Sequence, residues 1–106
     1  MLDGGSVIRF TDVSDFSKLY GFTIRGGSAG NDNGGGIYLS GNVVVKNTLI
    51  ADNSATEYGG GVCSRFTETE PTLINVTIAN NTSYSGDGIQ VYDYAKLILK
   101  NCIVWG

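Results

Sequence analysis

Residues 73–81 read LINVTIANN, and three other parts of the chain repeat this pattern. The copies are LYGFTIRGG from Leu19, VKNTLIADN from Val45 and LKNCIVWG from Leu99, about 26 to 28 residues apart. A second motif recurs between them, as GGGIYL from Gly34, GGGVCS from Gly59 and GDGIQV from Gly86. Two motifs that recur in the same order and phase establish an internal repeat, which has to be recognised before local structure is assigned.

Apolar residues fall in shared columns when these copies are aligned. The columns are Leu19, Val45, Leu73 and Leu99; Phe22, Thr48, Val76 and Cys102; Ile24, Ile50, Ile78 and Val104; and Ile37, Val62 and Ile89. Each run alternates with period two, which indicates strands, and so short a unit buries its apolar side only by stacking on another copy. The sequence therefore predicts an all-β fold, a right-handed parallel β-helix (a solenoid) of about four coils with three short strands per coil.

We expect residues 1–106 to form a single domain. Residues 1–18 make an irregular first coil, in which Ile8 and Phe10 match Val62 and Ser64 and a loop follows over residues 12–17. Neither end of the repeat carries the polar cap that solenoids usually have. We therefore expect either a piece of a longer protein or a subunit whose ends are covered by other copies.

The inward columns define the predicted core. It comprises Ile24, Ile37, Leu39, Val45, Ile50, Val62, Leu73, Val76, Ile78, Ile89, Val91, Leu97, Leu99 and Val104. Cys102 belongs to an inward column and Cys63 to an outward one, two coils apart. Two coils are about 9.6 Å at strand spacing, beyond the Cα separation of about 4.4 to 6.8 Å in a disulfide, so we expect two thiols.

Turn-forming residues occupy two further columns. Gly21, Asn47, Asn75 and Asn101 share one, and glycine and asparagine are the residues that adopt a left-handed backbone at least cost. We expect a tight bend there, with stacked asparagines bonding to each other in an amide ladder. Gly26-Gly27, Asp52-Asn53 and Asn80-Asn81 predict a second bend.

Composition excludes several classes of function. The net charge is −3, charged residues make up 16%, and the seven Lys and Arg are scattered, so we expect no nucleic-acid binding. No run approaches the roughly 20 apolar residues of a membrane span, so we expect no membrane insertion. The chain has no histidine, which removes the commonest acid–base residue and metal ligand.

The pairing of GGGI or GGGV with IADN and IANN resembles the GGA[ILV] and FxxN repeats of polymorphic outer-membrane proteins. More broadly, residues 19–106 resemble the right-handed β-helix repeats of the pectate-lyase-like superfamily. The resemblance implies an extracellular or cell-surface bacterial protein, although no signal peptide stands in this chain. Such folds host lyases, hydrolases, adhesins and passive stalks. The third glycine motif here is GDG, and Ile replaces Phe before xxN, which leaves the subfamily open.

Catalytic chemistry has little support in the strand columns. A glycan hydrolase needs two carboxylates about 5 to 10 Å apart over one groove, whereas the outward residues expected there are Thr23, Leu49, Thr77 and Ile103. Asp52 and Arg25 are expected close together but stand alone. Whether the chain is an enzyme stays uncertain, and the residues favour a non-catalytic protein.

The candidate metal ligands are three loop carboxylates, Asp32, Glu57 and Asp87. They are the calcium candidates, but calcium prefers about six to eight oxygen ligands, and we expect no bound metal and no cofactor.

Exposed tyrosines are the candidate glycan contacts, because aromatic rings stack on sugars. They are Tyr38, Tyr58, Tyr84, Tyr92 and Tyr94. Tyrosine and threonine are also common on ordinary β surfaces, which explains them equally well.

The last repeat strand ends in the apolar pair Ile103 and Trp105, which we expect at an end-to-end interface between copies. The leading hypothesis is a non-catalytic structural or adhesive β-helix module of an exported or cell-surface protein, forming a homo-oligomer through its solenoid ends. The alternative is a polysaccharide-binding module, or a fragment of a polysaccharide lyase or glycoside hydrolase.

Overall fold

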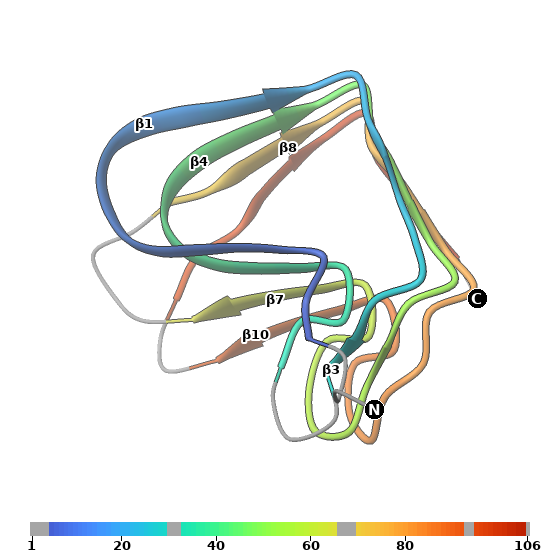
Figure 1. Ribbon diagram of the computed structural model, residues 1–106. Helices are drawn as coiled ribbons and strands as arrows, with labels where there is room; N and C mark the ends of the chain where they lie inside the picture. Colours follow the sequence, from blue (N-terminus) through green and yellow to red (C-terminus); the bar gives the residue numbers. More distant parts are fainter. Residues whose placement is uncertain (1–4, 30–32, 66–69, 93–94, 106) are drawn as a thin grey trace.

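The computed structural model describes residues 5–29, 33–65, 70–92 and 95–105, with the backbone alone for residues 11–16 and 92. The described secondary structure is β-sheet throughout (Figure 1). The strands are β1 (Ile8–Tyr20), β2 (Thr23–Ile24), β3 (Ser28–Ala29), β4 (Ile37–Lys46), β5 (Leu49–Ala51), β6 (Ser54–Ala55), β7 (Val62–Arg65), β8 (Thr72–Ile74), β9 (Thr77–Ala79), β10 (Ile89–Tyr92), β11 (Ile98–Lys100) and β12 (Ile103–Trp105). Within these described ranges there is no helix of the length and apolarity needed to span a bilayer.

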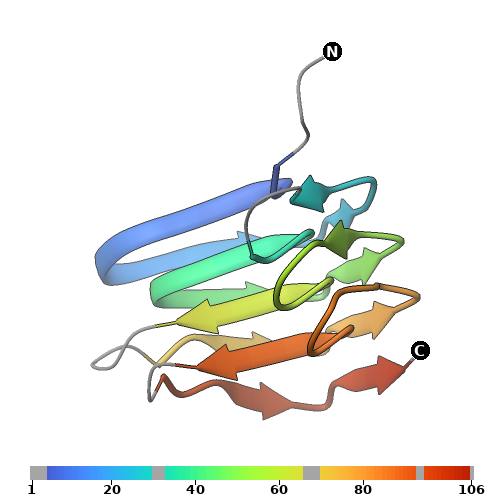
Figure 2. The ribbon, with the colours of Figure 1, turned by 90° about the horizontal axis from the view of Figure 1, so that it is seen from below.

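The chain winds into stacked tiers, each formed by one turn (Figure 2). The described strands make four: β1–β3, β4–β6, β7–β9 and β10–β12. The first wall holds β7, β10 and the first halves of β1 and β4; the second holds β8, β11 and the second halves; the third holds β2, β5, β9 and β12. All pairings between tiers are parallel. The all-β solenoid predicted from the repeat is thus confirmed.

Strand register reproduces the columns of the sequence alignment. Ile24, Ile50, Ile78 and Val104 pair in succession on the third wall. Leu19, Val45, Leu73 and Leu99 do so on the second wall, and Ile8, Ile37, Val62 and Ile89 on the first. Each column therefore brings chemically similar side chains into contact at successive tiers.

The corner between the first and second walls is formed by strand in the first two tiers, where the sequence predicted a loop in the first tier and separate short strands in each coil. β1 continues through residues 12–17, where a loop was predicted, with register irregularities at Val13 and Ser17. β4 likewise turns without a break, pairing with β7 through residues 37–39 and with β8 through residues 44–46. The first two tiers thus run one long bent strand over two walls, whereas in the third tier β7 ends at Arg65 and β8 begins at Thr72.

The buried core lies between the three walls. It comprises Ile24, Ile37, Leu39, Val43, Val45, Ile50, Val62, Leu73, Val76 and Ile78, with Ile89 and Leu97 partly buried against it. Val43 was not predicted. Three predicted core residues, Val91, Leu99 and Val104, are exposed, because their tier is covered from one side only. Phe22, also predicted inward, is 54% exposed in the first tier, which likewise has one neighbour.

Candidate functional site

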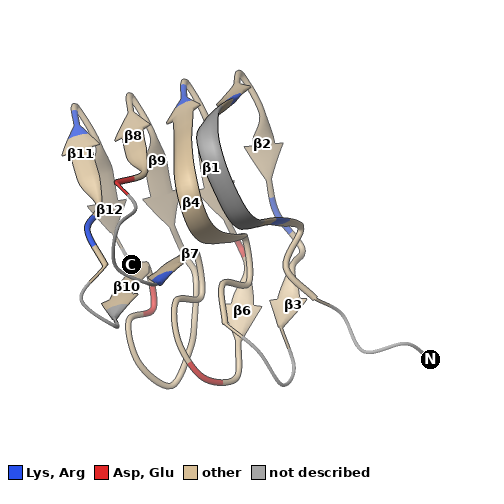
Figure 3. Cartoon of the chain, turned by 90° about the vertical axis from the view of Figure 1, so that its left-hand side faces the viewer, with Lys and Arg blue, Asp and Glu red and all other residues tan. Residues whose placement is uncertain are grey.

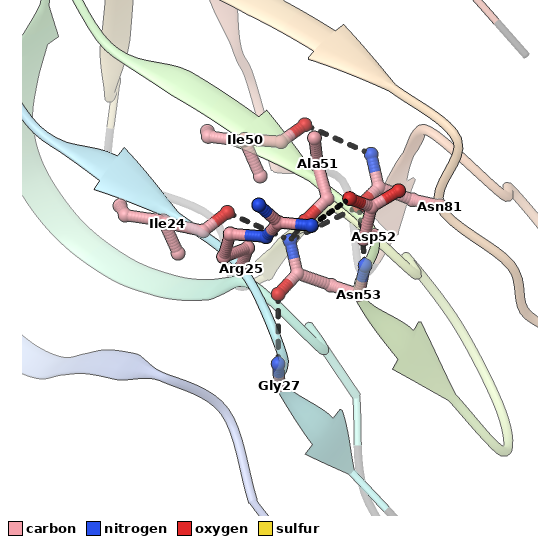
Figure 4. A network of polar contacts seen from close by, with 8 residues as sticks. All are labelled: Ile24, Arg25, Gly27, Ile50, Ala51, Asp52, Asn53 and Asn81. Atoms are coloured by element: carbon pink, nitrogen blue, oxygen red, sulfur yellow. Dashed lines mark hydrogen bonds and ion pairs between the residues drawn. The ribbon is translucent and has the colours of Figure 1, made fainter.

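A buried asparagine pair fixes the bend that ends the third wall (Figure 4). The backbone N–H and Nδ2 of Asn53 both donate to Oδ1 of Asn81, each at 3.0 Å. Asn81 Nδ2 donates to the Ile50 carbonyl at 3.1 Å, and the Gly27 N–H donates to Asn53 Oδ1 at 2.9 Å. We call Gly27, Asn53 and Asn81 the inner ladder. The sequence predicted the bend but not this ladder.

The predicted ladder lies at the bend before the third wall and is exposed. Asn75 Nδ2 donates to Asn47 Oδ1 at 3.3 Å, and we call this pair the outer ladder. The left-handed backbone predicted for this column is confirmed, with φ of 79° at Gly21, 54° at Asn47 and Asn75, and 52° at Asn101. The second predicted bend is left-handed too, with φ of 78° at Gly26, 56° at Asp52 and 54° at Asn80.

The outward side of the third wall, which we call the lateral face, lies between these two bends. Thr23, Leu49 and Ile103 are exposed and Thr77 is half-buried, as the period-two pattern predicted. Arg25 and Asp52 form an exposed ion pair at 2.8 Å on its edge, so their predicted proximity is confirmed. The Asp52 carboxylate is thus engaged by the Arg25 guanidinium.

Charged residues are sparse along the described chain (Figure 3). Glu57 and Asp87 are exposed, and Asp87 Oδ1 accepts a bond from the Ser83 N–H at 2.7 Å. Asp32, the third calcium candidate, lies outside the described residues. In the described ranges, no group of three or more Cys, Asp or Glu side chains gathers in a way that could hold a metal ion.

The tyrosines expected at the surface differ in their exposure. Tyr84 is almost fully exposed and Tyr58 is partly buried. The side chain of Tyr92 and the whole of Tyr94 lie outside what is described. Tyr38 is only 5% exposed, so its expected place at the surface is wrong.

A ring contact and close glycine backbone account for that burial, because the Arg9 guanidinium lies 4.2 Å from the centre of the Tyr38 ring. The loop before each first-wall strand folds back over the outward column that holds Tyr38 and Cys63, and a Cβ on Gly34 would lie 3.0 Å from the Tyr38 Cα. Gly59 has a φ of +68° and would place a Cβ 2.8 Å from that of Cys63. Cys63 is accordingly buried although it points outward, and both cysteines are thiols, as predicted.

The last tier presents the largest change in burial. Val91, Leu99 and Val104 are 37%, 45% and 46% exposed, whereas Leu73 and Ile78, one tier earlier in two of the same columns, are 0% exposed. We call these three residues the end face. Ile103 and Trp105, predicted at an end interface, belong to the same tier and are exposed, but Ile103 shares the lateral column of Thr77, beside the end face.

A family model described as a right-handed beta helix region matches residues 2–106. No curated protein and no solved structure matches the chain. The family match covers the four described tiers and agrees with the predicted handedness. It concerns the β-helix region as a whole, and the narrower resemblance to pectate-lyase-like or outer-membrane repeats stays a prediction.

Proposed function

The chain belongs to the right-handed β-helix family, and from that premise we propose that it is a structural or adhesive module that associates through the end of its solenoid. In this proposal it is part of an exported or cell-surface protein and does no catalysis itself. The exposed end face carries the proposal, because Leu99 and Val104 share columns with Leu73 and Ile78, which are fully buried one tier earlier.

The hydrophobic effect gives the driving force. Burial of apolar surface contributes about 25 cal/mol per Å², so covering ~600 Å² of an end would contribute ~15 kcal/mol before the costs of association. β10, β11 and β12 also each pair on one side only among the described strands, and an unpaired strand edge is a template for another strand.

The lateral face supports the non-catalytic part of the proposal. Its outward column consists of threonine and aliphatic residues, which neither accept nor donate protons at neutral pH. At the edge of this face, Arg25 pairs with the Asp52 carboxylate.

Concentration-dependent light scattering tests the association. The protein is expected to gain mass with concentration, and Val104→Lys is expected to abolish the gain, because a charge in an apolar contact loses its hydration. Leu49→Lys is the matched control, since it adds the same charge to the same wall two tiers away on the lateral face. A protein that stays monomeric at every concentration would contradict the proposal.

A polysaccharide-binding role is the second candidate, and the lateral face favours it. Trp105 is 70% exposed in the last tier, next to Ile103, and Leu49 is exposed on the same face. The Asn47 and Asn75 amides border that face and are hydrogen-bonding groups of the kind that sugar hydroxyls use. An indole and aliphatic side chains suit the apolar faces of sugar rings.

Tryptophan fluorescence during glycan titration tests this role, because Trp105 is the one tryptophan in the sequence. Quenching of Trp105 fluorescence by a glycan would support binding at the lateral face. In a binding assay that does not use fluorescence, Trp105→Ala should then lose affinity for the same glycan. Silence across a broad glycan array would contradict it. Cleavage of an acidic glycan by the chain would instead favour a lyase or hydrolase fragment.

A further inference from the structure

We propose that the corner between the second and third walls binds an acidic polysaccharide in which charged and uncharged sugars alternate. This inference rests on the proposed polysaccharide-binding role and adds the class of ligand. The corner carries the outer ladder and borders the lateral face, and the distribution of charge around the solenoid points to it.

This corner is basic in a chain whose net charge is −3. In the four tiers it is formed by residues 18–24, 44–50, 72–78 and 98–104. These stretches contain Lys18, Lys46 and Lys100, whereas all 10 Asp and Glu residues of the sequence lie elsewhere. The lysines are far apart in the sequence, and Figure 3 shows two of them, in blue, at the ends of β4 and β11. A corner with one sign of charge attracts a ligand of the opposite sign.

Outward residues at this corner form a row in which apolar side chains and lysines alternate. Strand pairing aligns one residue from each tier, namely Tyr20, Lys46, Ile74 and Lys100. We call these four residues the corner row. Tyr20 and Lys100 are exposed, and Lys46 and Ile74 are half-buried. The row runs along the side of the solenoid, so it faces outward whatever covers the two ends.

The two lysines of the corner row are available to a ligand. Neither Lys46 nor Lys100 pairs with a described carboxylate, and the Lys46 ammonium lies 5.8 Å from the centre of the Tyr20 ring. Lys96, just before β11, is instead paired with Glu70 at 3.3 Å. A lysine without a carboxylate partner gains a charge-assisted hydrogen bond when an anionic group binds to it.

The period of the corner row indicates how the charges of the ligand are spaced. Lys46 and Lys100 are two tiers apart, which is about 9.6 Å at strand spacing. One sugar of an extended polysaccharide is about as long as one tier is high. A glycan that lies along the row therefore brings a carboxylate to each lysine when every second sugar is acidic. The sugars between them lie over Tyr20 and Ile74, whose apolar surfaces suit the faces of uncharged sugar rings.

Amide side chains form a second row beside the first. Asn47, Asn75 and Asn101 each directly follow a member of the corner row, and all three are exposed. An amide both donates and accepts hydrogen bonds, as sugar hydroxyls do. The corner thus offers positive charge, apolar surface and amides in rows parallel to the solenoid axis, which is the combination that an acidic polysaccharide requires.

Calorimetric titration with an octasaccharide that alternates glucuronate and N-acetylglucosamine gives the first test. The protein is expected to bind it, and the double variant Lys46→Gln with Lys100→Gln is expected to lower the affinity about tenfold or more. Lys96→Gln is the matched control, because it removes a lysine that is already paired and lies outside the corner. Unchanged affinity in the folded double variant, or an equal loss in Lys96→Gln, would overturn the inference.

Substitution of Ile74 tests the period of the row. Wild-type protein is expected to prefer the alternating octasaccharide to an oligogalacturonate of equal length, which carries a carboxylate on every sugar. Ile74→Lys places lysines in three successive tiers, so it is expected to raise the affinity for the oligogalacturonate about tenfold or more. Thr72→Lys is the control, since it adds the same charge to the same strand outside the corner row. A wild-type preference for the oligogalacturonate would overturn the alternation.

Other ligands separate this inference from the proposed polysaccharide-binding role. Binding of a neutral glycan that the lysine variants leave unchanged would overturn the acidic ligand and leave that role standing. Absence of binding to every glycan would overturn both. Tighter binding to phosphatidylglycerol vesicles or to single-stranded DNA in the same buffer would overturn the choice of a polysaccharide for this corner.

Discussion

The inner and outer ladders contain the same residue type, asparagine, at two depths of one solenoid. Asn53 and Asn81 are buried, and their side chains bond to backbone groups of the first two tiers, those of Gly27, Asn53 and Ile50. Asn47 and Asn75 are exposed and share one bond of 3.3 Å. A buried polar group with no partner costs free energy, whereas an exposed one bonds to water. The contrast teaches that burial, and not the presence of asparagine in a repeat, decides how much a ladder stabilises the fold.

Asn81→Ala is expected to lower the free energy of unfolding more than any other variant proposed below, because it removes a buried amide of the inner ladder. It removes the acceptor of two buried Asn53 donors and the donor to the Ile50 carbonyl. Asn53 Nδ2 keeps the carbonyls of Ile24 and Ala51 as acceptors, so the Asn53 N–H is the donor that loses its acceptor. At about 1 to 3 kcal/mol for a buried group left unpaired, and about 1 kcal/mol for the other bonds lost, the free energy of unfolding should fall by about 2 to 4 kcal/mol. That is a large share of the roughly 5 to 15 kcal/mol of a typical domain. Urea titration followed by circular dichroism measures it, and a loss under about 1 kcal/mol would show that water replaces the amide.

Asn75→Ala, in the outer ladder, is expected to cost less and for another reason. Its φ is 54°, and alanine in a left-handed backbone costs about 1 to 2 kcal/mol. Asn75→Gly is the matched control, because glycine keeps the backbone and removes the same amide. If the outer bond itself contributes little, the glycine variant should unfold at nearly the wild-type urea concentration. Equal losses in both variants would instead assign the cost to the Asn75–Asn47 bond.

Repetition is why so much of the architecture could be predicted. Each column is sampled several times along the chain, so Ile24, Ile50 and Ile78 were placed side by side without any long-range information. The bends at Asn47 and Asn75 could be predicted because few residues other than glycine and asparagine adopt a positive φ at low cost.

The wrong predictions concern the exposure of residues whose burial depends on neighbouring loops or tiers. Tyr38 is on the predicted side of its strand, but the stacked glycine loops cover it, and no period within the strand reveals that packing. Val104 follows its column inward yet lies in a tier with one neighbour. The sequence contains one indication of the inner ladder. Asn53 and Asn81 each directly follow a residue with a left-handed backbone, and both asparagines are buried. The pairs Asp52-Asn53 and Asn80-Asn81 predict a bend from sequence, whereas the amide hydrogen bonds depend on the stacking of the tiers.

Asp52→Asn isolates the smallest contribution at these bends, the surface ion pair with Arg25. Asparagine tolerates the φ of 56° at this position, so the substitution removes the charge and leaves the backbone unstrained. The Arg25 and Asp52 side chains are 68% and 46% exposed, and pairs so exposed contribute about 0 to 1 kcal/mol. The loss should shrink further in 1 M salt, where the screening length falls to about 3 Å. Two results would contradict this expectation: a loss of unfolding free energy larger than that of Asn75→Ala, or a loss that salt leaves unchanged. Either would mean that Asp52 stabilises the inner bend through its backbone neighbours. Burial would then no longer explain why the inner ladder stabilises the fold more than the outer ladder.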